Sequence, residues 1–180
     1  PNHVGSKHNK ANAEYTLQRF KDWGWDAKIE TFKVLYPTPL KVSLDLIGKQ
    51  NFKATLTERP VPGAATSSRT KNQLPAYVAF QGDGDVTARV VYVNYGMPDD
   101  YKALQRMGVD VKGKIVIARY GQGWRGLKPQ LAQEAGAVGC IIYSDPRDDG
   151  FSTDDVYPKG AARPAQGFQR GSVAAMPLYP

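Results

Sequence analysis

Cysteine is almost missing from this chain. Its 180 residues include one, Cys140, so no disulfide can form within the chain and the redox compartment stays open. Because Cys140 lies inside the apolar run of residues 138–143, we expect a small buried hydrophobic side chain rather than a reactive thiol.

Histidine is scarce too, which bears on metal binding. His3 and His8, the two histidines of the chain, lie in its opening loop, where no third ligand at a fixed spacing accompanies them. The aspartates after position 144 miss the spacing of a calcium-binding EF-hand loop, which favours a solvated acidic loop. No G-x-S-x-G segment marks a nucleophilic serine. We therefore expect neither a metal site nor a complete catalytic site, and we assign no catalytic residue to this chain.

Long apolar runs are also missing. No segment approaches the roughly 18 to 20 apolar residues that a membrane span needs, and no charged-then-apolar leader opens the chain. We expect no membrane span here. The chain begins at Pro1 rather than at a methionine, and we expect it to be part of a longer protein.

Positive charge is plentiful but not clustered. The formal net charge is +7, yet basic residues are interleaved with carboxylates, as at Lys21 beside Asp22 and Arg147 beside Asp148. Nucleic-acid binding requires a basic patch or stripe that can displace counterions from phosphates. We therefore expect a solvated basic surface and no nucleic-acid partner.

The front of the chain shows one helical and three strand-like patterns. Residues 10–23 place Ala13, Leu17 and Phe20 on one side at helical spacing, and Gly24 follows as a stop signal. Residues 27–34 alternate as a strand does, and residues 41–48 and 52–58 predict an antiparallel hairpin. A loop rich in proline, glycine, serine and threonine follows over residues 59–75.

From residue 86 the pattern alternates between strand and helix. We expect strands over residues 86–95, 114–120 and 138–143, with helices over residues 98–107 and 127–135. Pro98 suits the first position of a helix, and Gly108 and Gly136 suit helix ends. Two of the strands lack alternation, which predicts parallel strands covered on both faces.

One glycine motif offers an alternative function. Gly121, Gly123 and Gly126 form a G-x-G-x-x-G run between a predicted strand and helix, with Asp145 about 20 residues further on. This pattern is typical of NAD-binding oxidoreductases, in which the glycines let the backbone approach a pyrophosphate. Bulky Trp124 and Arg125 inside the run favour a tight turn instead.

Several ordered segments resemble the protease-associated domain of the glutamate carboxypeptidase and transferrin receptor family. They are residues 88–95, 113–121, 124–128, 135–139 and 141–146. Residues 157–160 and 168–172 are similar to the stretch by which that domain returns to the peptidase body. Residues 1–6 and the helix after them look like the start of the family's peptidase domain.

The resemblance implies a fold and a division of the chain. The fold is α/β of the α+β kind: a mixed β-sheet or barrel-like sandwich flanked by helices, with an N-terminal helix and strand from the peptidase domain. Residues 1–36 would belong to that otherwise absent peptidase domain, and residues 37–180 would form the protease-associated domain. Without the peptidase body we expect the helix around Leu17 and Phe20 to be disordered or to self-associate.

The resemblance also implies a role. Two zinc ions would be held in the missing peptidase domain, so this chain would need no cofactor of its own. The chain would form one wall of the substrate entrance of a zinc-dependent carboxypeptidase or dipeptidase, with a peptide substrate and the peptidase domain as partners. The full-length protein is expected to be extracytoplasmic and is a possible homodimer. The alternative within the family is a receptor-like protein-binding module without peptidase activity.

Three positions bear on substrate preference. Glutamate-selective members of the family carry an arginine where this chain has Met97 and an asparagine where it has Ala162. Both carboxylate contacts would then be lost, so a preference for C-terminal glutamate is not expected. Arg163, next to Ala162, is a cation that could hold a carboxylate in their place.

Overall fold

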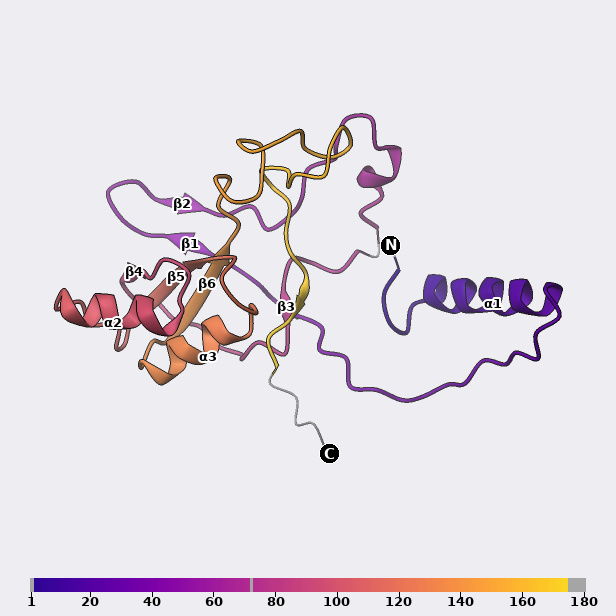
Figure 1. Ribbon diagram of the computed structural model, residues 1–180, viewed down its shortest axis with the longest axis horizontal. Helices are drawn as coiled ribbons and strands as arrows, with labels where there is room; N and C mark the ends of the chain where they lie inside the picture. The colour runs from indigo at the N-terminus through magenta and orange to yellow at the C-terminus, as the bar shows by residue number, and fades with distance from the viewer. Residues whose placement is uncertain (1, 72, 175–180) are drawn as a thin grey trace. The chain divides into compact units, whose positions relative to one another are not determined.

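The computed structural model describes residues 2–71 and 73–174 (Figure 1). Its contacts divide the chain into two compact units, Pro1–Ala76 and Tyr77–Pro180. The expected family boundary after residue 36 is a different division and stays a prediction.

In the first unit, helix α1 spans Lys7–Asp22 and begins three residues earlier than expected. The Ser6 hydroxyl caps it by accepting a hydrogen bond from the Asn9 N–H at 3.1 Å. Gly24, with φ of +83°, follows its last turn. No residue of α1 is buried. Leu17 and Phe20 line a hollow of about 330 Å³ together with Ala27, Ile29 and other residues.

The strands of the first unit are short. Strands β1 (Asp45–Leu46) and β2 (Phe52–Lys53) pair antiparallel, which confirms the expected hairpin but not its length. The prediction of a strand over residues 27–34 is wrong, because these residues belong to no β-ladder in the structure. A strand needs a partner for its backbone groups, and alternation by itself does not supply one. A 3₁₀-helix, Ala65–Ser68, lies within the loop over residues 59–75.

The second unit contains the parallel sheet that the sequence predicts. Strands β4 (Val90–Tyr92), β5 (Ile115–Arg119) and β6 (Gly139–Tyr143) lie in that order. Helix α2 (Pro98–Arg106) connects the first two strands and α3 (Leu127–Glu134) the last two. Figure 1 shows both helices on the same side of the strands, as expected for right-handed crossovers.

The helix termini confirm the local signals. Pro98 occupies the first position of α2, and the Asp100 carboxylate accepts a hydrogen bond from the Met97 N–H at 2.9 Å. Gly108 and Gly136 follow α2 and α3 with φ of +71° and +82°, a conformation that glycine adopts without strain.

The core lies between the sheet and the two helices. It consists of five buried residues: Val93, Val111, Val116, Ala118 and Ala132. Tyr101 and Leu104 of α2 pack against this cluster. The two strands predicted to be parallel and covered, β5 and β6, are parallel and contain no exposed residue, although burial alternates along β5 between buried and partly buried positions. In β4, Val90 and Tyr92 are about half exposed. Apolar runs show that strands are central, but not how well each face is covered.

A second strand pair was not predicted. Strand β3 (Val78–Ala79) pairs in parallel with β7 (Gly171–Ser172), which joins the two ends of the second unit. The structure is therefore a mixed α/β arrangement of α-helices and small sheets, while a barrel-like sandwich stays a prediction. Among the described residues, no helix is long and apolar enough to cross a bilayer.

Candidate functional site

Polar side chains gather at the carboxyl edge of the sheet β4–β5–β6. Tyr95 follows β4, Arg119 ends β5, and Asp145 and Asp148 follow β6. The three strands are parallel and in register, so their carboxyl ends meet at one edge. This edge is where open α/β sheets usually bind ligands.

Arg119 is the centre of this cluster. Its Nε donates to Asn94 Oδ1 at 3.1 Å, and its Nη1 donates to Asp148 Oδ2 at 3.2 Å. Asp145 Oδ2 lies 3.6 Å from the same Nη1. The Arg119 side chain is only 15% exposed, so its charge is partly desolvated and needs these acceptors.

The two aspartates are held by neighbours as well. Tyr95 donates its hydroxyl hydrogen to Asp148 Oδ2 at 3.0 Å, and Tyr143 donates to Asp145 Oδ2 at 3.2 Å. The backbone N–H of Arg147 lowers the pKa of Asp145, with the Tyr143 hydroxyl and Arg119 adding to the effect. Asp145 therefore stays ionised opposite Arg119 at neutral pH.

A lysine occupies the interior beside this cluster. Lys128 of α3 is completely buried, and its Nζ donates to the carbonyl oxygens of Tyr95 at 2.6 Å and Gly121 at 2.9 Å. Burial lowers the pKa of its ammonium group. Lys128 and Ala132 are the buried residues of α3 and are one helical turn apart.

The glycines of the G-x-G-x-x-G run make room for the chain's own side chains. A Cβ on Gly121 would lie 2.9 Å from the Tyr95 ring, and one on Gly126 would lie 2.2 Å from the Trp124 ring. A Cβ on Gly123 would lie 2.8 Å from Met97 Sδ. These contacts support the tight-turn interpretation of the motif over the NAD-binding one.

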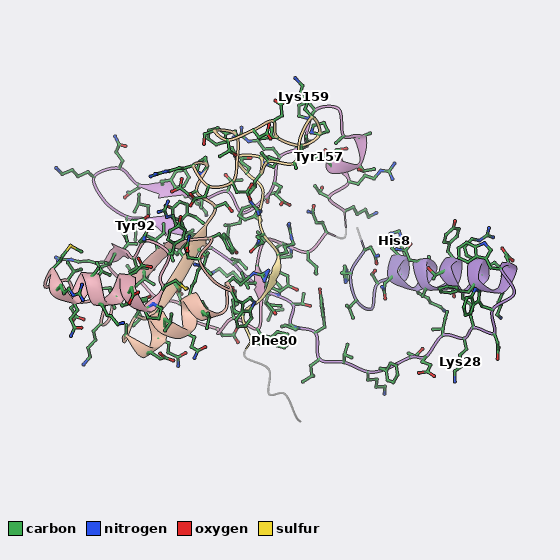
Figure 2. All side chains as sticks on the ribbon, in the orientation of Figure 1. His8, Lys28, Phe80, Tyr92, Tyr157 and Lys159 are labelled. Atoms are coloured by element: carbon green, nitrogen blue, oxygen red, sulfur yellow. The ribbon has the colours of Figure 1, made fainter. Side chains whose placement is uncertain are left out.

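The three residues proposed from the sequence lie in two segments. Met97 precedes α2, with its sulfur against Gly123. Ala162 forms an isolated bridge with Val156 in the loop that follows β6. In the same loop, Figure 2 shows the side chains of Tyr157 and Lys159, with Lys159 directed outward.

Arg163 already has a partner within the chain. Asp149 Oδ1 accepts from its backbone N–H and Asp149 Oδ2 from its Nε, both at 3.2 Å. The Arg163 side chain is about a quarter exposed. Asp149 therefore holds the stem of this guanidinium in place, a contact that the sequence did not reveal.

A further arginine was missed by the sequence reasoning. Arg125 donates from Nε to Gln169 Oε1 at 3.1 Å, and its guanidinium lies 2.6 Å from the place of a Cβ on Gly171. It therefore joins the loop after β5 to strand β7. No local pattern signals this contact, since Gln169 is 44 positions from Arg125.

The arrangement does not fit a metal centre. The described part of the chain contains no group of three or more histidine, cysteine, aspartate or glutamate side chains that could hold a metal ion. The zinc ions implied by the resemblance therefore find no ligand set among these residues. The polar edge instead acts as a brace, since Arg119 and Lys128 both donate to groups of the chain itself.

Comparisons with known proteins agree on the family. The family model described as "PA domain" matches residues 86–176. A probable glutamate carboxypeptidase from Arthroderma benhamiae is 36% identical over 178 residues, which is 96% of this chain and 24% of that protein. A glutamate carboxypeptidase 2 homolog from Caenorhabditis elegans is 47% identical over 113 residues, or 58% of this chain and 15% of that protein. The chain thus spans at most about a quarter of the length of these relatives.

A solved structure shows a similar fold. An aminopeptidase from Aneurinibacillus sp. strain AM-1 superposes with a TM-score of 0.54 at 24% identity. The match covers 96% of this chain and 31% of that one.

Proposed function

The chain belongs to the PA-domain family, in the form found in glutamate carboxypeptidases, and on this premise we propose that it is the non-catalytic, substrate-facing domain of a zinc-dependent exopeptidase. The metal ions and the general base would come from the rest of the longer protein. A catalytic zinc pair would activate a water molecule there, and this chain would shape the entrance through which a peptide arrives.

The observation that carries the proposal is the convergence of three loops at the carboxyl edge of the parallel sheet. These loops follow β4, β5 and β6, and they begin with Val93, Tyr120 and Ser144. Contacts of Arg119 and Lys128 tie the loops to one another. Loops tied to one another in this way are suited to orient a substrate, because loops held before binding lose little conformational entropy on binding.

Substrate preference is proposed to depend on Met97, Ala162 and Arg163. Met97 and Ala162 offer no charge to a carboxylate, so a preference for C-terminal glutamate is not expected. Arg163 would supply a replacement cation: Asp149 engages its Nε, and an arginine carries two further nitrogens that can donate to a carboxylate. A peptide carboxylate is the natural acceptor for such a fork.

The test uses the full-length protein with zinc and a panel of peptides that differ in the C-terminal residue. Arg163→Ala is expected to raise KM about tenfold, the loss typical of one charge-assisted hydrogen bond, with a small change in kcat. Arg147→Ala is the matched control, since Arg147 is an exposed arginine in the same segment. An unchanged KM for every peptide would remove Arg163 from the proposal. Absence of hydrolysis by the wild-type protein would overturn the peptidase role and favour the receptor-like alternative.

A further inference from the structure

Lys128 occupies an unusual place for a lysine. Its side chain is completely buried, although lysine is almost never fully buried without a partner. The partners seen here are two main-chain carbonyl oxygens, of Tyr95 and Gly121, at 2.6 and 2.9 Å from Nζ. These two residues are 26 positions apart in the sequence and belong to different loops.

The two loops meet again further along. Two residues beyond Tyr95 lies Met97, and two residues beyond Gly121 lies Gly123. A Cβ on Gly123 would lie only 2.8 Å from Met97 Sδ, so the Met97 side chain rests against the Gly123 backbone. The Lys128 ammonium and this contact therefore hold the same two loops together at two points.

The Tyr95 ring fills the space between the loops. A Cβ on Gly121 would lie 2.9 Å from the ring, and the Arg119 guanidinium lies 4.0 Å from the ring centroid. A Cβ on Gly96 would lie 3.2 Å from the Ala118 Cβ and 3.9 Å from the Lys128 Cβ. The backbone from Tyr95 to Met97 is thus packed closely against β5 and α3.

Core stability alone does not account for a lysine at this position. Burying an ammonium costs free energy, and an apolar side chain of the same length could fill the space of its stem at lower cost. What an apolar side chain lacks is donors for the two carbonyl groups, which would be left buried and unsatisfied. The ammonium is a compact donor that can serve both carbonyls at once.

We propose that Lys128 is a positioning residue that locks the Tyr95 loop to the Gly121 loop and thereby sets the place of Met97 at the substrate-facing edge. The part of this inference that concerns substrate rests on the proposed function. The part that concerns the two loops stands on the contacts of Lys128 alone. Two measurements separate these parts.

The first measurement is amide hydrogen exchange in the full-length protein, read by mass spectrometry for residues 94–97 and 121–124. Lys128→Met is expected to speed exchange in these two segments about tenfold or more, because their shared anchor is lost. The core strand β5 is expected to exchange as in the wild type. Lys102→Met is the control, since Lys102 is an exposed lysine of α2.

The second measurement is peptide hydrolysis by the same variants. Lys128→Met is expected to raise KM about five- to tenfold with kcat largely kept, since Lys128 contacts the loops rather than the reacting atoms. Lys128→Gln, which keeps a neutral donor, is expected to fall between the wild type and Lys128→Met in both measurements.

The outcomes are distinct. Wild-type exchange in both segments of Lys128→Met would overturn the lock, and so would faster exchange spread evenly through α2, α3 and the sheet. Failure of both variants to fold would show that Lys128 is required for the core, and this result would also overturn the proposed positioning role. Faster local exchange with an unchanged KM would overturn the link between Lys128 and substrate binding. An inactive wild-type protein would overturn the proposed function, and the exchange measurement alone would then decide whether Lys128 holds the two loops together.

Discussion

The guanidinium of Arg119 lies over the ring of Tyr95, with its Cζ atom 4.0 Å from the ring centroid. Arg119 ends strand β5, whereas Tyr95 is in the loop that follows β4. The stacked pair therefore fastens that loop to the neighbouring strand. The Tyr95 hydroxyl extends the connection to Asp148, beyond β6.

We expect Arg119→Met to lower the free energy of unfolding, because Asp145 and Asp148 would face each other without their cation. Arg119→Lys should lower the free energy of unfolding less, since it keeps the charge but loses the planar stack and the fork. Denaturant-induced unfolding measures both values. Arg147→Met, at an exposed arginine, is the control and should change stability by less than about 0.5 kcal/mol.

Gly160 is expected to be intolerant of a side chain. A Cβ at this position would lie 2.3 Å from the Asp155 carbonyl oxygen, and a backbone atom cannot swing aside as a side chain can. Gly160→Ala should therefore destabilise the protein by about 1–3 kcal/mol and loosen the loop that carries Ala162.

The matched control for Gly160→Ala is Gly84→Ala, at a glycine outside this loop. A Cβ on Gly84 would meet nothing within 4 Å, so this change should be close to neutral. Thermal unfolding and hydrogen exchange over residues 155–162 report the two effects. Equal behaviour of the two alanine variants would contradict the contact with Asp155.

Cys140 is expected to resist alkylation. Burial raises the pKa of its thiol from 9.0 to about 11, and the thiolate is the form that reacts. At pH 9 the native thiol should react about 50-fold more slowly than the same cysteine in urea-unfolded protein. Iodoacetamide labelling, followed on the peptide that contains Cys140, measures this ratio. A ratio near one would show that the thiol is open to solvent.

The raised pKa of Cys140 also makes the free energy of unfolding depend on pH. A raised pKa means that the folded state keeps the proton longer than the unfolded state does. Its contribution to stability is therefore complete below about pH 9 and is lost as the pH rises toward about 11. Cys140→Ala should remove this part of the alkaline loss of stability.

Met97→Arg is expected to shift substrate preference in the full-length protein. If this position faces the substrate, a guanidinium there should lower KM for peptides with a C-terminal glutamate about tenfold relative to neutral residues. Met97→Leu controls for the change in shape without charge. A preference identical in all three proteins would place residue 97 away from the substrate.

Much of the second unit was predictable because its signals are local. The order of β4, α2, β5, α3 and β6 follows from periodicity, and Pro98, Gly108 and Gly136 act within one turn of the helices that they bound. The front of the chain was less predictable. Its alternating residues 27–34 pair with no strand, because a ladder depends on a partner that alternation does not specify.

The sequence suggested candidate site residues, and their contact with substrate stays a prediction. The carboxyl edge of a parallel sheet follows from the strand order, and the resemblance pointed to Met97, Ala162 and Arg163. The roles of Arg119, Lys128 and Arg125 were not seen, since each depends on distant residues. Arg125 and Gln169, for example, are 44 positions apart.

The amino-acid sequence by itself determined the family of this protein, the order of its parallel strands and crossover helices, and the ends of those helices. These features depend on residue spacing over a few turns or on ordered motifs. Only the tertiary structure decided which face of the sheet is covered, that β3 pairs with β7, and which groups accept hydrogen bonds from Arg119 and Lys128. The acceptor carbonyl of Tyr95 is 33 residues from Lys128, and contacts over such separations exist only once the chain has folded.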